Sequence, residues 1–403
     1  MQFQSIIGQA GSKEKLAEMV QHNRLSHALL LLGKEGSGAL SLAMAFAQYI
    51  VCEKVNGKIS AAPEPSLFGD PEPAADAPAV YMDSCGECPA CKKAGELIHP
   101  DIHFSYPVIT KKPGEKPVST DFIKEWRSFV AEQPYGNVFD WLQFIGAENK
   151  QGNITAAECN DIIRKLNLKS FESEYKILVM WMPEFLGKEG NKLLKLIEEP
   201  PPNTLFLLVA ENEGQLLQTI LSRTQLVKIP MLQNSDVQNA LITRENVAPE
   251  KARQVALLSE GNYREALQLL QHAEDDWQLM LRDWLNAVLK TGPVAQLKWI
   301  EETAKLGREK QKQFLRYFIH LLEQAIRLRT MEFAETPEDD TGNTDFALRL
   351  NRICSIPQQE AIINELDKAS YYIERNANGK MLFHALSIRL YHIISNNSLI
   401  LMD

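Results

Sequence analysis

The sequence has no surplus of basic residues. It carries 43 Lys and Arg against 52 Asp and Glu, a formal net charge of -9. A protein that grips DNA alone usually presents a basic face, so this balance favours partner proteins as the main ligands. It disfavours a stand-alone zinc-dependent nucleic-acid-binding protein, because the cysteines described below also lack an accompanying stripe of aromatic and basic residues.

Long apolar runs are also missing. No run approaches the roughly 20 residues that span a bilayer, and residues 1–8 contain no basic segment followed by an apolar one. We therefore expect no secretory signal and a cytoplasmic location. Cysteine is scarce, with six residues in 403, and in a cytoplasmic chain such residues indicate metal ligands or structural thiols more than disulfides.

Apolar runs and helical periodicities divide the chain. At 403 residues it is too long for one ordinary core, so two or three domains are expected. Up to about residue 230, strand-like runs alternate with helices, which implies a parallel sheet covered by helices; the predicted strands are 28–32, 176–181, 204–210 and 226–229. Three short helices are expected over 236–272, and long amphipathic helices follow 277.

Two insertions interrupt this pattern, at 55–84 and 107–153. The stretch 61–80 of the first holds five prolines and no basic residue, so we expect a mobile loop there. The second contains Trp126 and Trp141, and it is expected to fold onto the surface as short helices. A further acidic, turn-rich loop is expected near 335–343.

The strand at 28–32 runs into a turn with the glycine spacing of a Walker A phosphate loop. Gly33, Gly36 and Gly38 take the glycine places, and a helix follows at once. In such a loop the backbone N–H groups hold phosphates at a helix N-terminus. A working loop then needs a lysine and a Ser or Thr, but Ala39 and Leu40 stand there. Loss of the lysine alone removes a contact worth roughly 1.5–3 kcal/mol.

The strand at 176–181 lacks the acidic pair that holds magnesium in an active P-loop ATPase. It ends in Trp181, and Glu184 comes three residues late, as a surface or capping residue. The two departures together predict a retained fold without hydrolysis, with ATP binding absent or weak. Two alternatives stay open for the loop: a plain strand-to-helix turn, and compensation by Lys34 from another register.

Four of the six cysteines share one pattern, in which three follow one another at two-residue gaps and the fourth ends the preceding helix. They are Cys52, Cys85, Cys88 and Cys91. Four thiolates in a loop-rich segment predict a closed structural zinc site, in a module over 52–91. Free thiols and an iron–sulfur cluster are the alternatives, with His99 as a substitute ligand. Cys159 and Cys354 stand alone and are predicted to lie in helix cores.

Several segments resemble the AAA+ subunits of bacterial DNA sliding-clamp loaders. The run Asn191 to Pro201 is similar to their signature N-x-L-L-K-x-L-E-E-P-P, and Thr219 to Thr224 is similar to T-I-x-S-R-C with Thr in place of Cys. Residues 7–9, 24–28 and 99–101 match further, as does the cysteine quartet. Together these segments span the α/β part of the chain in the right order.

The resemblance implies an α/β fold: an AAA+, RecA-like, P-loop-type parallel-sheet domain with the zinc module over 1–230, a small helical lid over 231–275, and an all-α C-terminal collar for oligomerisation over 276–403. It also implies a hetero-oligomer with tau or gamma and delta subunits of DNA polymerase III. The sliding clamp and primed DNA are met through the assembled complex, and no membrane is involved.

Within that family, tau and gamma hydrolyse ATP with complete Walker motifs. This chain departs from them at Ala39, Leu40 and Trp181. It therefore resembles the rigid, non-hydrolysing subunit that closes one end of the pentameric loader during DNA replication. The alternative is an active ATPase subunit of the same loader.

Two arginines receive roles from the resemblance alone. Arg223 matches the arginine finger that completes a neighbouring subunit's ATP site, and the alternative is an ordinary salt bridge on a loop. Arg264, in the run 261–266, resembles the second sensor motif that faces the phosphate loop. Because that loop is degenerate, a functional role for Arg264 and a structural remnant remain equally open.

Overall fold

The computed structural model describes residues 1–57, 82–110, 114, 116–147, 152–271, 277–330, 341–374 and 377–396. The chain divides into two compact units, Met1–Gln271 and His272–Asp403. The loop expected at 61–80 lies outside the described residues, as do parts of the insertions at 55–84 and 107–153. Among the described helices, none combines the length and the apolar character needed to cross a membrane.

A five-stranded parallel sheet with the order β2-β3-β4-β1-β5 forms the centre of the first unit. Its strands are β1 (Ala28–Gly33), β2 (Ile102–Ser105), β3 (Lys176–Trp181), β4 (Thr204–Ala210) and β5 (Gln225–Ile229). The three central strands are nearly continuous apolar runs, as a sheet covered on both faces requires. Four strands match the sequence prediction. The edge strand β2 was not predicted, because its four residues include His103 and Ser105 and form no apolar run.

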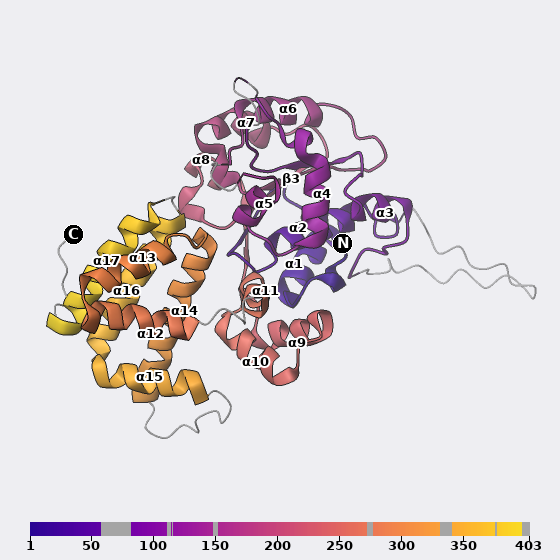
Figure 1. Ribbon diagram of the computed structural model, residues 1–403. Coiled ribbons are helices and arrows are strands. Elements are labelled where there is room, and N and C mark those ends of the chain that lie inside the picture. The colour runs from indigo at the N-terminus through magenta and orange to yellow at the C-terminus, as the bar shows by residue number, and fades with distance from the viewer. Residues whose placement is uncertain are drawn as a thin grey trace, which may run out of the picture. The chain divides into compact units, whose positions relative to one another are not determined.

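Alternate side chains of the strands enter two separate cores, since successive residues of a strand point to opposite faces. Leu29 and Leu31 of β1 belong to one core, and Leu30 belongs to the other. The first core is covered by α1 (Ala10–Gln21), α2 (Ala39–Val51), α3 (Pro89–Gly95), α4 (Ile123–Glu132) and α5 (Val138–Phe144). The second is covered by α6 (Ala156–Leu166), α7 (Asn191–Glu198) and α8 (Gln218–Leu221), as Figure 1 shows. Short 3-10 turns are η1 (Phe3–Ser5), η2 (Ser119–Phe122), η3 (Pro183–Gly190) and η4 (Glu213–Gln215).

The 107–153 insertion forms short helices, α4 and α5, as expected. Its aromatic residues belong to the first core, so the expected place on the surface was wrong. Trp126 and Trp141 are 1% and 0% exposed. The ring of Trp126 lies 5.3 Å from that of Trp141 and 5.3 Å from that of Trp181 at the end of β3. The Trp141 indole N–H donates to the Pro107 carbonyl at 2.7 Å. These rings cover one face of the sheet because burying them removes large apolar areas from water.

This packing predicts a large loss of stability on truncation of the insertion's central ring. Trp141→Ala is expected to lower the free energy of unfolding of the first unit by about 3–5 kcal/mol. Chemical denaturation followed by circular dichroism measures the change. Phe171→Ala is the matched control, because Phe171 is 83% exposed and its loss should change stability by less than about 0.5 kcal/mol. Equal stability of the two variants would show that the insertion is not part of the core.

Three short helices complete the first unit, as predicted: α9 (Asn234–Glu245), α10 (Pro249–Leu258) and α11 (Tyr263–Gln271). Their apolar faces form a small core around Val237, Leu241 and Ala252. Ile7 and Tyr135 also enter this core, so the helices pack on the α/β part of the same unit. We call α9–α11 the lid below; a domain boundary at 231 stays a prediction.

The second unit is all-helical in its described part. It contains α12 (Trp277–Asn286), a π-helical turn η5 (Ala287–Thr291), α13 (Pro293–Thr303), α14 (Arg308–Thr330), α15 (Thr341–Ile353), α16 (Ile356–Glu374) and α17 (Gly379–Asn396). Trp284 and Trp299 stack at its centre, with ring centroids 4.8 Å apart. Cys354 is buried in the core of these helices, as predicted, and directly follows the last residue of α15. Helix α15 begins within the loop expected at 335–343, of which 335–340 lie outside the described residues.

Candidate functional site

The glycine-rich segment 33–40 forms a tight turn between β1 and α2. Gly36 and Gly38 have φ of 73° and 82°, which glycine adopts without the steric cost that other residues meet. No side chain caps the N-terminus of α2, and free amides at such an end are a common anion site. The backbone has the shape of a phosphate loop. Ala39 and Leu40 stand buried where a lysine and a hydroxyl would be needed.

A turn of the 107–153 insertion lies directly against this loop. A Cβ atom added to Gly38 would lie 2.7 Å from the Tyr135 ring, and Ser41 Oγ donates to the Pro134 carbonyl at 2.5 Å. The remaining cavity, lined also by Trp181, measures about 20 Å³. That is room for about one water molecule, whereas ligand pockets measure roughly 300–1,000 Å³. The loop is therefore covered by the protein's own residues.

Arg264, at the start of α11, reaches the same loop from the lid. Its guanidinium is 5% exposed and forms ion pairs with Glu35 of the loop and with Asp140 of α5. The Glu35 bond measures 2.9 Å, and the Asp140 contact is bidentate, through Nε and Nη2. Nearby, the Asn262 side chain donates to Glu35 and the Tyr263 amide donates to the Gly36 carbonyl at 3.3 Å. The structure thus brings Gly33, Gly36, Gly38 and Arg264 into one site.

The end of β3 supplies no carboxylate to this site. Trp181 is buried there and packs against the insertion. Glu184 accepts hydrogen bonds from the amides of Glu211 and Asn212 at 2.7 and 2.9 Å, after the end of β4. Burial raises the pKa of Glu184. Glu184 therefore caps a backbone turn, which confirms the capping interpretation from the sequence, and its side chain is half-buried.

Three residues of this site were not found from the sequence: Glu35, Tyr135 and Asp140. Glu35 could have been recognised from the sequence, because an acidic residue within a phosphate loop repels an anionic ligand. Asn137 and Asp140 form a capping box at the start of α5, and that spacing predicts a helix start but no distant partner. Tyr135 gave no signal, since an aromatic residue in an insertion is more often part of a core.

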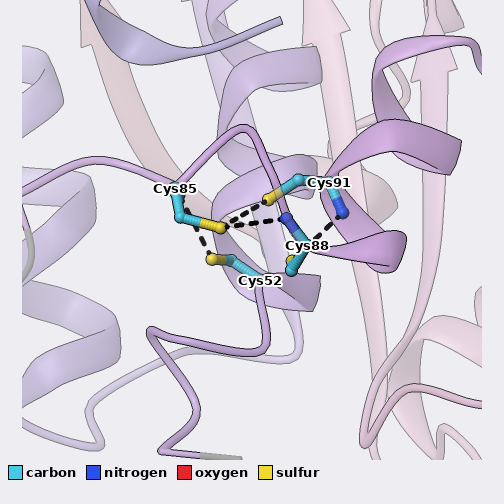
Figure 2. Close-up of side chains that lie close together, drawn as sticks. All are labelled: Cys52, Cys85, Cys88 and Cys91. Atoms are coloured by element: carbon cyan, nitrogen blue, oxygen red, sulfur yellow. Dashed lines mark hydrogen bonds between the residues drawn. The ribbon is translucent and has the colours of Figure 1, made fainter. Parts of the chain in front are cut away.

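The four cysteines of the predicted quartet converge in space (Figure 2). Cys52 follows α2, Cys85 lies in the next described loop, and Cys88 and Cys91 begin α3. All four sulfur atoms lie within 4.8 Å of one another, and the Cys85 and Cys91 sulfurs are 3.9 Å apart. A tetrahedral zinc site with bonds of about 2.3 Å separates its sulfurs by about 3.8 Å. The cluster can therefore hold a metal ion such as zinc.

Backbone amides surround these sulfurs as donors. The amides of Cys85, Cys88 and Cys91 point to the sulfurs of Cys52, Cys85 and Cys88, at 3.3, 3.3 and 3.4 Å. Such donors stabilise thiolates and orient metal ligands. The pKa of Cys52 is lowered, chiefly by the hydrogen bond from the Cys91 thiol.

His99 stands outside the cysteine cluster, so its alternative role as a ligand was wrong. Its Nδ1 accepts from the Asp101 amide, and its Nε2 lies 3.4 Å from a Glu172 carboxylate oxygen. Asp101 in turn accepts from the amides of residues 171–173. The His-Pro-Asp segment thus holds the loop before β3.

Arg223 makes its described contacts away from the phosphate loop. It follows α8, and its Nη1 donates to the Thr219 carbonyl at 3.0 Å and to Ser222 Oγ at 3.1 Å. Its Nε lies 3.3 Å from a carboxylate oxygen of Glu198. About a third of the side chain is exposed, so a positioned cation lies at the surface. Both interpretations of Arg223 fit this geometry.

Comparison with known proteins gives consistent matches. The sequence model of a family described as "DNA polymerase III, delta subunit" matches residues 8–64 and 74–233. Subunit delta′ of DNA polymerase III from Bacillus subtilis is 26% identical over 259 residues, covering 64% of this chain and 58% of that protein. The delta′ subunit of Escherichia coli is 25% identical over 320 residues, covering 78% and 74%. Subunit tau of B. subtilis is 25% identical over 314 residues, covering 76% of this chain but only 44% of tau.

Proposed function

We infer the function from one premise: the chain belongs to the DNA polymerase III, delta subunit family, and it is a clamp-loader subunit of the delta′, tau and gamma kind. Within that kind we propose the delta′ role. The subunit would assemble with tau or gamma and delta, and it would help to load the sliding clamp onto primed DNA without hydrolysing ATP. The observation that carries this is the phosphate loop, which has Ala39 and Leu40 at its chemical positions and Tyr135 against its backbone.

Three finer proposals belong to the same role. The four cysteines hold a structural zinc ion, and the distances between their sulfur atoms fit such an ion. Arg223 is an arginine finger for a neighbouring subunit's ATP site. The second unit is the collar that joins the other subunits. The expected cytoplasmic location also stays a prediction.

The purified chain alone is expected to release no phosphate from ATP above background, and to co-purify with tau or gamma and delta as a defined complex. Phosphate release and size-exclusion chromatography measure the two properties, and tau or gamma assayed alone is the positive control. The proposed role would be contradicted by turnover in the isolated chain that Gly38→Val abolishes. If the chain is folded but does not bind the other subunits, it does not function as a clamp-loader subunit.

A further inference from the structure

Two carboxylates lie beside the covered phosphate loop. The Glu35 carboxylate lies in the loop itself, and the Asp140 carboxylate approaches from the insertion. Both meet the guanidinium of Arg264, a residue of the lid. Bidentate pairing of an arginine with a carboxylate has the same geometry as its pairing with a phosphate. Two carboxylates of this chain therefore satisfy the lid arginine as an anionic ligand would.

Side chains also replace the bulk of a ligand. The Tyr135 ring sits against Gly38, and its hydroxyl accepts from the Ile7 amide at 2.8 Å. The same ring meets Tyr263 of the lid edge to face, with centroids 5.0 Å apart. Tyr135 thus contacts the phosphate loop on one side and the lid on the other. It joins the two parts through apolar contact, while Asp140, five residues later, joins them through charge.

The charge balance of this site opposes an incoming phosphate. Lys34, Glu35 and Glu211 line the cavity, and together with Asp140 and Arg264 they sum to one net negative charge. The side chains of Glu35, Asp140 and Arg264 are 18%, 15% and 5% exposed. A phosphate that entered would have to displace a partly buried carboxylate from Arg264. Separating a partly buried ion pair is unfavourable because it leaves a charge without its partner. Ala39 occupies the Walker A lysine position, and Lys34, the lysine of this loop, is exposed.

We propose that Glu35, Tyr135 and Asp140 form a built-in substitute for nucleotide, which keeps the lid closed on the phosphate loop permanently. The 107–153 insertion then has a function, since it supplies two of the three residues. This inference deepens the proposed non-hydrolysing role: the subunit is rigid because its lid is held by an intramolecular ligand. Nucleotide would neither enter the site nor change the position of the lid.

Hydrogen exchange of the full-length isolated chain tests the proposal. Exchange of the amides in α9–α11 is expected to be unchanged by millimolar ATP and Mg²⁺. In Glu35→Gln/Asp140→Asn the same amides should exchange at least about 10-fold faster, because Arg264 loses its ion pairs with Glu35 and Asp140. The side-chain carbonyl that replaces the Asp140 carboxylate can still accept from the Asn137 N–H, so the cap of α5 is kept. Glu189→Gln is the matched control, because its ion pair with Lys192 is exposed on both sides, and lid exchange should not change.

Protection of β4 in the same experiment reports whether the double variant is folded. If the double variant loses the protection of β4, the single variant Glu35→Gln is measured instead. This variant keeps the bidentate contact between Arg264 and Asp140, and faster exchange of the lid amides is again expected. Unchanged lid exchange in a folded variant would overturn the proposal, as would added lid protection by ATP in the wild type. Co-purification with loader subunits is scored separately, so failure of the lock and failure of the proposed function are distinguishable.

Discussion

Replacing Cys88 by serine is expected to abolish tight zinc binding and to release the segment around α3. Structural zinc contributes roughly 10–16 kcal/mol of apparent binding free energy in small zinc-dependent folds. Helix α3 has only seven residues, and its buried side chains are the small ones of Ala90, Cys91 and Ala94. A helix of this length is unstable alone. The metal should therefore hold the module against α2.

Elemental analysis measures the first part of this result. Wild-type chain purified without chelators should contain about one zinc equivalent, and Cys88→Ser should contain close to none. Cys159→Ser is the matched control, because Cys159 is also buried but lies on α6, where its sulfur points to the Glu189 carbonyl at 3.7 Å. Less than about half an equivalent in the wild type would refute the zinc site, and iron in its place would favour the iron–sulfur alternative.

Hydrogen exchange measures the second part. Chelation should increase exchange in α3 and in the preceding loop, where Asp83 accepts from the amides of Phe3 and Gln4. The N-terminal residues should loosen with it. The helices of 277–396 form a separate core around Trp284, so their exchange should be unchanged. Unfolding of both units together on chelation would show that the metal has a wider role than a local one.

Local patterns were sufficient for most of the framework. The buried strands are apolar runs such as 28–32 and 204–210, and the three lid helices follow helical periodicity. The cysteine quartet could be predicted because closely spaced thiols in a loop-rich segment are the usual ligands of a structural zinc ion. In each case the determining residues are near one another in the sequence, or the residue type itself limits the chemistry.

The contacts of the phosphate loop could not be predicted in the same way. Arg264 is 124 residues from Asp140 and 229 from Glu35, and no local pattern specifies such a pairing. The insertion was placed on the surface because its spacing shows no regular element. Its tryptophans, more than its periodicity, indicate burial, because large indole rings are usually packed against other apolar groups such as the face of a sheet.

Arg223→Ala is expected to lower the clamp- and DNA-stimulated ATP hydrolysis of the reconstituted loader while the complex still assembles. An arginine finger faces the charge that develops on the transferred phosphate, and it is worth about 10³–10⁵ in rate at the site it completes. In the proposed role this subunit completes only one of several sites, so the loss for the whole loader should be partial. The position of Arg223 after α8, held by the Thr219 carbonyl, leaves its cation at the surface.

Three further variants separate this role from a structural one. Arg223→Lys should not restore full hydrolysis, because an ammonium cannot pair with two phosphate oxygens in the geometry of a guanidinium. Glu198→Gln removes the only ion pair described for Arg223. If that pair is only structural, the variant loader should hydrolyse ATP at the wild-type rate. Arg164→Ala is the matched control, since Arg164 is an exposed arginine paired with Asp161 on α6. A normally assembled Arg223→Ala loader that hydrolyses ATP and loads clamps at the wild-type rate would make Arg223 a structural residue, and the contribution of this subunit would then be architectural.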